Sequence, residues 1–131
     1  MSPTQRALAE CRKRGWTAQV VEKWVAPARR RIDLFGVIDL IVLDGQGGGP
    51  LGVQITSGQH HGERITKALE EPRLKLWMQS PARFEVWSFA KRSIKLGGPR
   101  KVWKLRRSAA NPEAPHWGVE EINVRDLVPP T

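Results

Sequence analysis

The sequence predicts an α/β fold in which a helix, three strands, a second helix and a fourth strand form a sandwich, followed by further strands. Three observations indicate this class. Residues 37–44 ("VIDLIVLD") are almost continuously apolar, as is typical of a strand that is covered on both faces. Residues 51–57 ("LGVQITS") form a second β-prone run directly after a glycine-rich turn. Helical patterns precede and follow these strands, so helices are available to cover both faces of the sheet.

Residues 3–14 are predicted to form the first helix. Ser2 is a suitable N-cap, and Gly15 is a suitable residue to end the helix. At about 100° per residue, Cys11 falls on the apolar side of this helix and Glu10 points well away from it. We interpret Cys11 as a small core residue.

The segments between this helix and the second one alternate between predicted strands and turns. Residues 16–25 are rich in β-branched and aromatic side chains, which favours a strand, and residues 26–36 are expected to form a basic crossover loop. Residues 45–50 ("GQGGGP") predict a hairpin turn between the strands at 37–44 and 51–57. A phosphate-binding loop is the weaker interpretation of these glycines, because neither a Lys-Ser/Thr pair nor a helix follows them.

The second half of the chain predicts one interrupted helix and then strands. Residues 60–71 are expected to be helical as far as Pro72, which interrupts the helix, and residues 73–80 continue as a second helical piece. The remaining predicted strands are residues 83–91, 100–107 and 116–127, and residues 128–131 are expected to fray.

Length and charge place limits on the class of protein. The 131 residues predict one domain, with a core over about residues 3–90 and a basic β extension over about residues 91–128. The chain carries 22 Lys and Arg residues against 13 Asp and Glu residues, for a net charge of +9. This excess favours a polyanionic partner, nucleic acid first and an anionic membrane second, although a basic surface can also serve only to keep a protein soluble.

Several other classes are disfavoured. No apolar run approaches the ~20 residues of a membrane-spanning helix. The first fifteen residues lack the apolar centre of a signal peptide, so a cytoplasmic location is expected. The single cysteine excludes an internal disulfide and a thiolate metal cluster.

Polar residues inside the predicted buried strands form the candidate site. Gln54 and Thr56 share one face of their strand, and Asp39 interrupts the apolar strand before it. If the two strands pair as a hairpin, Asp39 lies close to Gln54. On the preceding strand, Glu22 is a further acid in an apolar setting, and Lys23 has the opposite parity.

Carboxylates, an amide oxygen and backbone carbonyls are the hard ligands that Mg²⁺ and Mn²⁺ prefer. In a basic protein, such a set indicates metal-assisted cleavage of phosphodiester bonds. The expected metal ligands are Asp39, Gln54, Glu22 and the backbone of Ile55. A structural role stays open, because a single Asp in a strand can also cap a turn or pair with an arginine such as Arg31.

The run from Arg31 to Ser57, "RIDLFGVIDLIVLDG…LGVQITS", resembles the PD-(D/E)XK nuclease superfamily, and the order of the predicted elements is similar to the core of that superfamily. Within it, the chain is most similar to small Holliday-junction-resolvase-like and VRR-NUC-like proteins, and to phage and prophage proteins of this size. The resemblance covers roughly residues 3–90. It implies a restriction-endonuclease-like three-layer α/β sandwich with an αβββαβ core and a mixed sheet.

The motif of this family has an aspartate on the second core strand and an acid-x-lysine on the third. Asp39 matches the aspartate and Gln54 matches the acid, whereas Thr56 stands where the family has its lysine. The resemblance implies one of two outcomes. Either Lys23 or Arg64 supplies the missing cation near the scissile phosphate, or cleavage has been lost and the chain is a DNA-binding module.

The same resemblance implies a Mg²⁺- or Mn²⁺-dependent endodeoxyribonuclease that acts on branched or structured DNA as a homodimer. In this family, an acid from the first helix also contributes to the site. By position, Glu10 corresponds to that acid. Glu22 is preferred, because Glu10 points away from the apolar side of its helix. Asp33 is expected either to support the metal ligands or to cap its turn.

Basic residues gather in two segments. One is the arginine run at 29–31, and the other contains eight basic residues and no acid: Lys91, Arg92, Lys95, Arg100, Lys101, Lys104, Arg106 and Arg107. The residues expected to contact DNA are Arg29, Arg30, Arg31, Ser57, His60, Lys101, Lys104 and Arg106. Such binding is independent of sequence and depends on salt. A merely solvated hairpin, and a protein-interaction or RNA-associated module, stay open as alternatives.

The chain has six tryptophans and no tyrosine. Trp77 and Trp87 are expected in the core. Trp103 lies between lysines and can stack on an unpaired base, although core packing is favoured for it too. His60 and His61 are expected at the solvated start of the second helix, where either can contact phosphate. A zinc site is disfavoured, because adjacent histidines do not share a helix face and no Cys or third His accompanies them.

Overall fold

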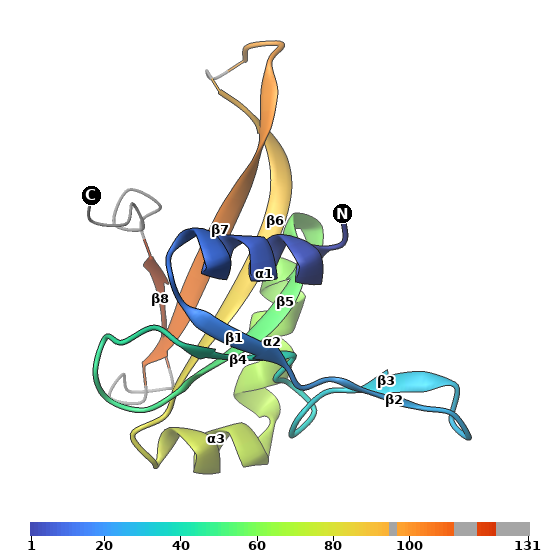
Figure 1. Ribbon diagram of the computed structural model, residues 1–131, viewed down its shortest axis with the longest axis vertical. Coiled ribbons are helices and arrows are strands. Elements are labelled where there is room, and N and C mark those ends of the chain that lie inside the picture. Colours follow the sequence, from blue (N-terminus) through green and yellow to red (C-terminus); the bar gives the residue numbers. More distant parts are fainter. Residues whose placement is uncertain (95–96, 112–117, 123–131) are drawn as a thin grey trace.

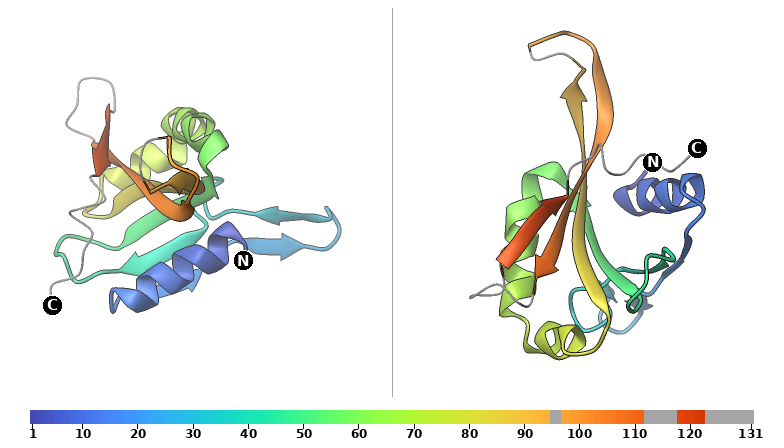
Figure 2. Two further views of the ribbon diagram at one scale, coloured as in Figure 1. Left: turned by 90° about the horizontal axis from the view of Figure 1, so that it is seen from above. Right: turned by 90° about the vertical axis from the view of Figure 1, so that its left-hand side faces the viewer.

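The computed structural model describes residues 1–94, 97–111 and 118–122. It is a three-layer α/β sandwich, in which a six-stranded mixed sheet lies between one helix on one face and two helices on the other (Figure 1, Figure 2). This arrangement confirms the predicted α/β class and the mixed sheet with additional strands toward the C-terminus.

The elements follow the predicted order. The helices are α1 (Pro3–Lys13), the short 3-10 helix η1 (Gly58–His60), α2 (His61–Glu70) and α3 (Pro72–Met78). The sheet contains, in spatial order, β1 (Thr17–Val20), β4 (Leu40–Leu43), β5 (Leu51–Ser57), β6 (Arg83–Ser93), β7 (Lys101–Asn111) and β8 (Gly118–Ile122). Strands β5 and β6 are parallel, and the other neighbouring pairs of this sheet are antiparallel. Two further strands, β2 (Lys23–Val25) and β3 (Arg30–Ile32), pair with each other in a separate ribbon.

Helix α1 begins at the predicted cap. The Ser2 Oγ accepts a hydrogen bond from the Gln5 N–H at 3.2 Å, and the Gln5 Oε1 accepts one from the Ser2 N–H at 2.8 Å. This reciprocal pair satisfies two backbone donors that have no partner inside the helix. The helix ends at Lys13, one residue before its predicted end, and Gly15 then adopts a φ of +73°.

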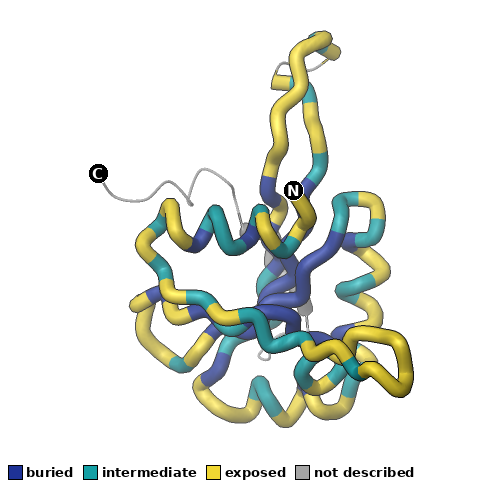
Figure 3. The backbone as a smooth tube through the Cα atoms, turned by 45° about the vertical axis from the view of Figure 1, so that its right-hand side comes forward, coloured by how far each residue is buried: buried dark blue, intermediate teal, exposed yellow. Residues whose placement is uncertain are grey.

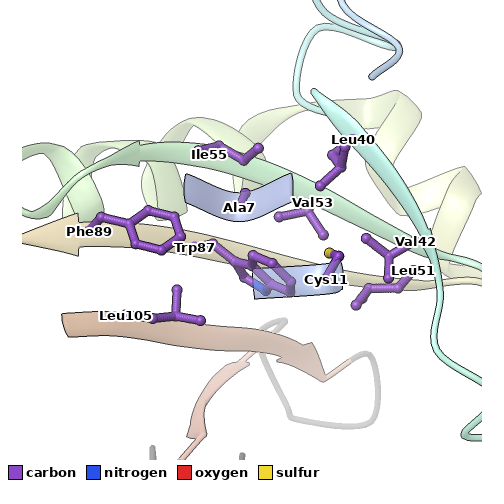
Figure 4. Packing of buried hydrophobic residues seen from close by; sticks show 10 residues of the cluster. All are labelled: Ala7, Cys11, Leu40, Val42, Leu51, Val53, Ile55, Trp87, Phe89 and Leu105. Carbon is purple, nitrogen blue, oxygen red and sulfur yellow. The ribbon is translucent and has the colours of Figure 1, made fainter. Parts of the chain in front are cut away.

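Apolar side chains form one cluster on each face of the sheet. The cluster under α1 includes Ala7, Cys11, Val53, Ile55 and Trp87 (Figure 4), which confirms Cys11 and Trp87 as core residues. The cluster under α2 and α3 contains Val37, Ile38, Ala68, Leu74, Phe84 and Val86, and Trp77 packs against it. Figure 3 shows that the buried backbone is concentrated in the central strands.

The alternation along β5 decides where its polar side chains lie. Val53 and Ile55 belong to the cluster under α1. Because successive side chains of a strand point to opposite faces, Gln54 and Thr56 point to the face covered by α2. Gln54 is only 2% exposed and Thr56 7%. The predicted burial of two polar side chains on one face is therefore confirmed, and their partners have to come from inside the protein.

The prediction of one strand over residues 16–25 is wrong. The strand breaks at Val21 and Glu22, and β2 leaves the sheet to pair with β3, so the loop predicted over residues 26–36 contains a strand. The resulting ribbon projects from the sandwich (Figure 1). Residues 23–32 carry four basic residues and no acid. Its large apolar side chains Trp24 and Ile32 stay exposed instead of packing against the sheet, and its backbone groups are satisfied by the pairing of β2 with β3.

The strand predicted over residues 37–44 begins three residues later, because its first part is a tight turn. Leu34 and Ile38 form an antiparallel bridge. Between them, φ is +53° at Phe35 and +77° at Gly36. Glycine adopts this left-handed conformation readily, whereas for a bulky residue such as Phe35 it is uncommon. The apolar run is buried as predicted, but its first residues are buried in a turn.

The second half of the chain largely follows the prediction. Helices α2 and α3 are separated at Pro72, which is the first residue of α3. Strands β6 and β7 are longer than predicted and extend beyond the rest of the sheet (Figure 1). Of the strand predicted over residues 116–127, the structure describes Gly118–Ile122, and the rest lies outside the described residues, as do residues 128–131. Within the described ranges, no helix is long and apolar enough to cross a membrane.

Candidate metal centre

The backbone of Asp39 joins three strands at one end of the sheet. Its carbonyl accepts a hydrogen bond from the Val21 N–H at 2.9 Å, and its N–H donates to the Val53 carbonyl at 2.8 Å. Val21 directly follows β1, Val53 lies in β5, and Asp39 directly precedes β4. The position of Asp39 is therefore held by the sheet itself.

The Asp39 side chain lies against the end of β5. Its Oδ2 accepts hydrogen bonds from the Gln54 Nε2 at 2.7 Å and from the Ile55 N–H at 2.8 Å. The predicted closeness of Asp39 and Gln54 is thus observed. The N–H and C=O of one residue in a strand point toward the same neighbouring strand, so the Ile55 carbonyl is directed to the side of β5 on which Asp39 lies.

Two further acids complete a cluster around Asp39. One carboxylate oxygen each from Glu22, Asp33 and Asp39 lies within 4.8 Å of the other two. Glu22 directly precedes β2 and Asp33 directly follows β3, so pairing of the two strands brings both acids to the base of the ribbon. The tight turn between Leu34 and Ile38 then places Asp33 beside Asp39.

Glu22 and Asp39 were expected as metal ligands, whereas Asp33 was expected either to support the ligands or to cap its turn. The signal for Asp33 was its separation of six residues from Asp39, across a segment that contains a glycine. Glu10, the acid that the family pattern points to by position, lies elsewhere and accepts a hydrogen bond from the Arg14 Nε at 2.8 Å. The preference for Glu22 over Glu10 therefore agrees with their positions in the structure.

Burial raises the pKa of Asp39 to about 8, the largest cause being loss of solvent around the carboxyl group. The hydrogen bond with Asp33 and the charges of Asp33 and Glu22 raise the pKa further, and the hydrogen bond from the Ile55 N–H lowers it in part. Asp39 therefore holds its proton up to a higher pH than an exposed aspartate does. A bound cation would reverse this preference, because it stabilises the ionised carboxylates.

One buried oxygen of the site has no partner. Among the described residues, the Gln54 Oε1 is buried without a hydrogen-bond donor, although the Nε2 of the same amide is bonded to Asp39. A buried acceptor without a partner costs roughly 1–3 kcal/mol. Three carboxylates and one free amide oxygen are a hard-oxygen set, which is suited to Mg²⁺ or Mn²⁺.

Cations around the cluster differ from those predicted. Thr56, at the position of the lysine in the PD-(D/E)XK motif that the sequence resembles, is buried. Lys23 is exposed on β2, and Arg64 is half-buried on α2 with no hydrogen bond or ion pair to any described residue. The Arg31 Nη1 instead donates to the Glu22 Oε1 at 2.8 Å. The sequence named Arg31 as a possible partner of the strand aspartate, whereas in the structure Arg31 pairs with Glu22.

Comparison of the chain with protein-family models, with curated proteins and with solved structures found no match.

The predicted DNA contacts fall into three places. Arg29, Arg30 and Arg31 are exposed on the ribbon, and Lys101, Lys104 and Arg106 are exposed on β7. Ser57 and His60 are half-buried where β5 passes into η1, and the His60 Nδ1 lies 3.1 Å from the Glu63 Oε2. Of these residues, Arg31 contacts the acid cluster directly, since its Nη1 donates to the Glu22 Oε1.

Two residues expected at the surface are buried. Arg107 is 5% exposed, and its guanidinium donates to both carboxylate oxygens of Glu85, at 2.5 and 2.9 Å. His61 is fully buried, with its ring nitrogens 2.6 Å from the Ser88 Oγ and 2.7 Å from the Ser108 Oγ. Arg107, one of the eight basic residues of its segment, therefore does not contribute to the basic surface, and the expectation that His61 can contact phosphate is wrong.

Trp103 departs from its prediction in the opposite direction. Core packing is the favoured expectation for it, but it is 46% exposed on β7. Lys95, one of the eight basic residues of this region, lies outside the described residues. Whether a side chain of β7 is buried depends on the strand and helix that face it, and these come from distant parts of the chain.

Proposed function

We propose that this chain is a divalent-metal-dependent endodeoxyribonuclease that hydrolyses phosphodiester bonds in branched or otherwise structured DNA. The observation that carries the proposal is the Gln54 Oε1, a buried acceptor without a donor among the described residues, beside the three carboxylates of Glu22, Asp33 and Asp39. A buried acceptor without a donor is costly, and a cation held by these carboxylates would supply the partner that the Gln54 Oε1 lacks within the described part of the chain.

The donor set fits a hard cation. The ion would be held by the carboxylates of Glu22, Asp33 and Asp39, the amide oxygen of Gln54 and the carbonyl of Ile55. When bound, Mg²⁺ or Mn²⁺ supplies a charge that stabilises the phosphate in the transition state and lowers the pKa of a water molecule. Gln54 is a neutral ligand, so the site is expected to bind its ion more weakly than a site with a fourth carboxylate.

The residues of the chain have separate tasks in this mechanism. With a cation bound, Asp39 would be an ionised ligand, its proton having passed to solvent, and the Ile55 N–H would hold its carboxylate in place. Arg31 lies at the cluster through Glu22, and its side chain is 66% exposed, so its guanidinium can turn to a phosphate oxygen. We propose Arg31 as the cation that takes the place of the family lysine, and Lys23 and Arg64 stay predictions for the same role.

The ribbon supports DNA as the substrate. Its residues 23–32 carry four basic side chains and no acid, and the acid cluster lies at its base. A two-stranded ribbon is narrow enough to enter the major groove, which is about 12 Å wide. Basic side chains along it would hold the phosphate backbone of a duplex next to the metal ligands, with an affinity that falls steeply with salt.

The test is cleavage of four-way-junction, flap, single-stranded and linear duplex DNA in Mg²⁺, Mn²⁺ or EDTA. The wild type is compared with Asp39→Ala and with Glu70→Ala, a control that removes an exposed acid of α2 outside the cluster. We expect cleavage that requires the cation, is lost in Asp39→Ala and is unchanged in Glu70→Ala. Calorimetric titration with Mn²⁺ provides a second readout, in which Asp39→Ala alone loses binding.

A DNA-binding protein without cleavage activity is the second candidate, and the observation that favours it is Thr56 in place of the lysine. DNA binding with no cutting in either cation would contradict the nuclease and support this candidate. Binding that does not depend on salt would argue instead for a protein-interaction module. The homodimer implied by the family resemblance stays a prediction, which light scattering tests directly.

A further inference from the structure

A pocket lies between α1, the end of β5 and the β6–β7 hairpin. It has a volume of about 380 Å³, and its lining includes Arg6, Ser57, Phe89, Lys91, Arg92 and Trp103. Ser57 is two residues beyond Ile55 on β5, so the pocket and the acid cluster lie near the same end of the sheet. Phe89 belongs to the core under α1, whereas the metal ligand Gln54 points to the opposite face.

The pocket offers one aromatic surface. Trp103 is 46% exposed, although large apolar side chains of a strand that faces a helix are usually covered. The Arg6 guanidinium carbon lies 3.7 Å from the centroid of the Trp103 ring, and the Lys91 ammonium lies 5.7 Å from it. The Arg6 guanidinium therefore covers part of one face of the ring, and the exposed part of the Trp103 side chain is open to solvent.

The charge around this ring has one sign. Arg6, Lys91 and Arg92 line the pocket, and none of the described residues in the lining carries a carboxylate. Three cations without a neutralising acid repel one another and favour an anion. The pocket therefore combines a flat aromatic surface with an anion site, in a volume within the range of small-molecule pockets.

We propose that this pocket binds one nucleotide of an unpaired DNA strand, with its base against Trp103 and its phosphate among Arg6, Lys91 and Arg92. Aromatic side chains interleaved with cations are the means by which proteins bind single strands without sequence preference. Binding of this nucleotide requires no metal ion. The proposal rests on the proposed function only for the choice of DNA as the polymer. It specifies that the structured DNA contains an unpaired strand.

The test is fluorescence anisotropy in EDTA with three labelled ligands: a 12-nucleotide single strand, the blunt duplex of the same sequence, and an abasic 12-nucleotide strand. Stacking of one base on an aromatic side chain corresponds to about tenfold or more in affinity. Trp103→Ala is therefore expected to weaken binding of the single strand about tenfold, and binding of the duplex and the abasic strand less than about twofold. Trp103→Phe keeps an aromatic surface and is expected to retain most of the affinity.

Leu76→Ala is the control, because Leu76 is a large apolar side chain that is 65% exposed on α3, outside the pocket and the ribbon. It is expected to leave single-strand affinity unchanged. The proposal is overturned if Trp103→Ala leaves single-strand affinity unchanged, if it weakens the abasic strand equally, or if Leu76→Ala causes the same loss. Single-strand binding that depends on Trp103, in a protein that cuts no DNA in Mn²⁺, would overturn the nuclease and leave this pocket standing.

Discussion

Replacing Asp39 by Asn separates stability from metal binding. The asparagine side chain would have nearly the shape of the native one and would still accept the hydrogen bond from the Ile55 N–H, which is 2.8 Å from the Asp39 Oδ2 in the native protein. Its amide group can donate to Asp33, as the protonated Asp39 carboxyl does. The substitution therefore removes a titratable group and a metal ligand while it preserves the packing around them.

The magnitude follows from the pKa of Asp39, which is raised from 3.8 to about 8 by burial, the hydrogen bond with Asp33 and the neighbouring acids. A carboxyl group whose pKa is higher in the folded than in the unfolded chain contributes stability that is complete below about pH 4. That contribution is lost as pH rises through about 8. Between about pH 4 and pH 8, each pH unit lowers the unfolding free energy of the wild type by up to about 1.4 kcal/mol. At pH 8 without metal, Asp39→Asn should therefore be the more stable protein by a few kcal/mol.

The assay is urea unfolding, followed by tryptophan fluorescence between pH 5 and pH 8, first in EDTA and then in Mn²⁺. In EDTA, the wild type is expected to lose stability with rising pH relative to Asp39→Asn. In Mn²⁺ at a hundred times its dissociation constant, the wild type should gain about 2.7 kcal/mol, and Asp39→Asn should gain far less. Metal binding by the wild type is expected to strengthen up to about pH 8, because the proton on Asp39 competes with the ion.

Two results would refute this reasoning. A wild type more stable than Asp39→Asn at pH 8 in EDTA would show that Asp39 is ionised in the free protein, held by its hydrogen-bond donors. Equal stabilisation of both proteins by Mn²⁺ would show that the ion binds away from Asp39, which would also contradict the proposed metal centre.

Three further predictions concern stability and are measured by the same urea unfolding. Arg107→Ala leaves Glu85 buried without its cation and should lower the unfolding free energy by about 3–5 kcal/mol, and an effect below about 1 kcal/mol would contradict the buried pair. His61→Ala removes a fully buried ring and leaves two hydroxyl groups without it, for a loss of about 2–4 kcal/mol, whereas a surface histidine would cost almost nothing. Gly52→Ala places a Cβ 2.9 Å from a core isoleucine and should cost about 1–3 kcal/mol, while Gly62→Ala on α2, where a Cβ meets nothing within 4 Å, should be neutral or stabilising.

The elements with strong local patterns were predictable. The strand at residues 51–57 agrees with its prediction at both ends, because a glycine-rich turn precedes it and a helix follows it. The start of α1 was predictable from Ser2, whose capping hydrogen bond involves only residues close to it in the chain. The break at Pro72 has an equally local cause, since proline lacks the N–H that a helix interior requires.

Half of the candidate site was predictable in the same way. Asp39 and Gln54 lie on adjacent strands of a hairpin, so their separation along the chain and the short turn predicted that they lie close together. Asp33 was not assigned to the cluster, because its position depends on the left-handed turn at Phe35 and on the pairing of β2 with β3. The composition of residues 23–32 is as compatible with a basic loop as with the strand pair that the structure contains.

The sequence by itself determined the α/β class, the order of the core elements, the helix caps and the pairing of Asp39 with Gln54, because each depends on residues near one another in the chain or on a period along it. Only the tertiary structure decided which charged and aromatic side chains are buried. Arg107 and Trp103 lie in the same basic strand, yet Arg107 faces Glu85 inside the protein and Trp103 faces Arg6 at the surface. Their partners come from strands and helices distant in the chain, and the free energy of burying a charge depends on those partners.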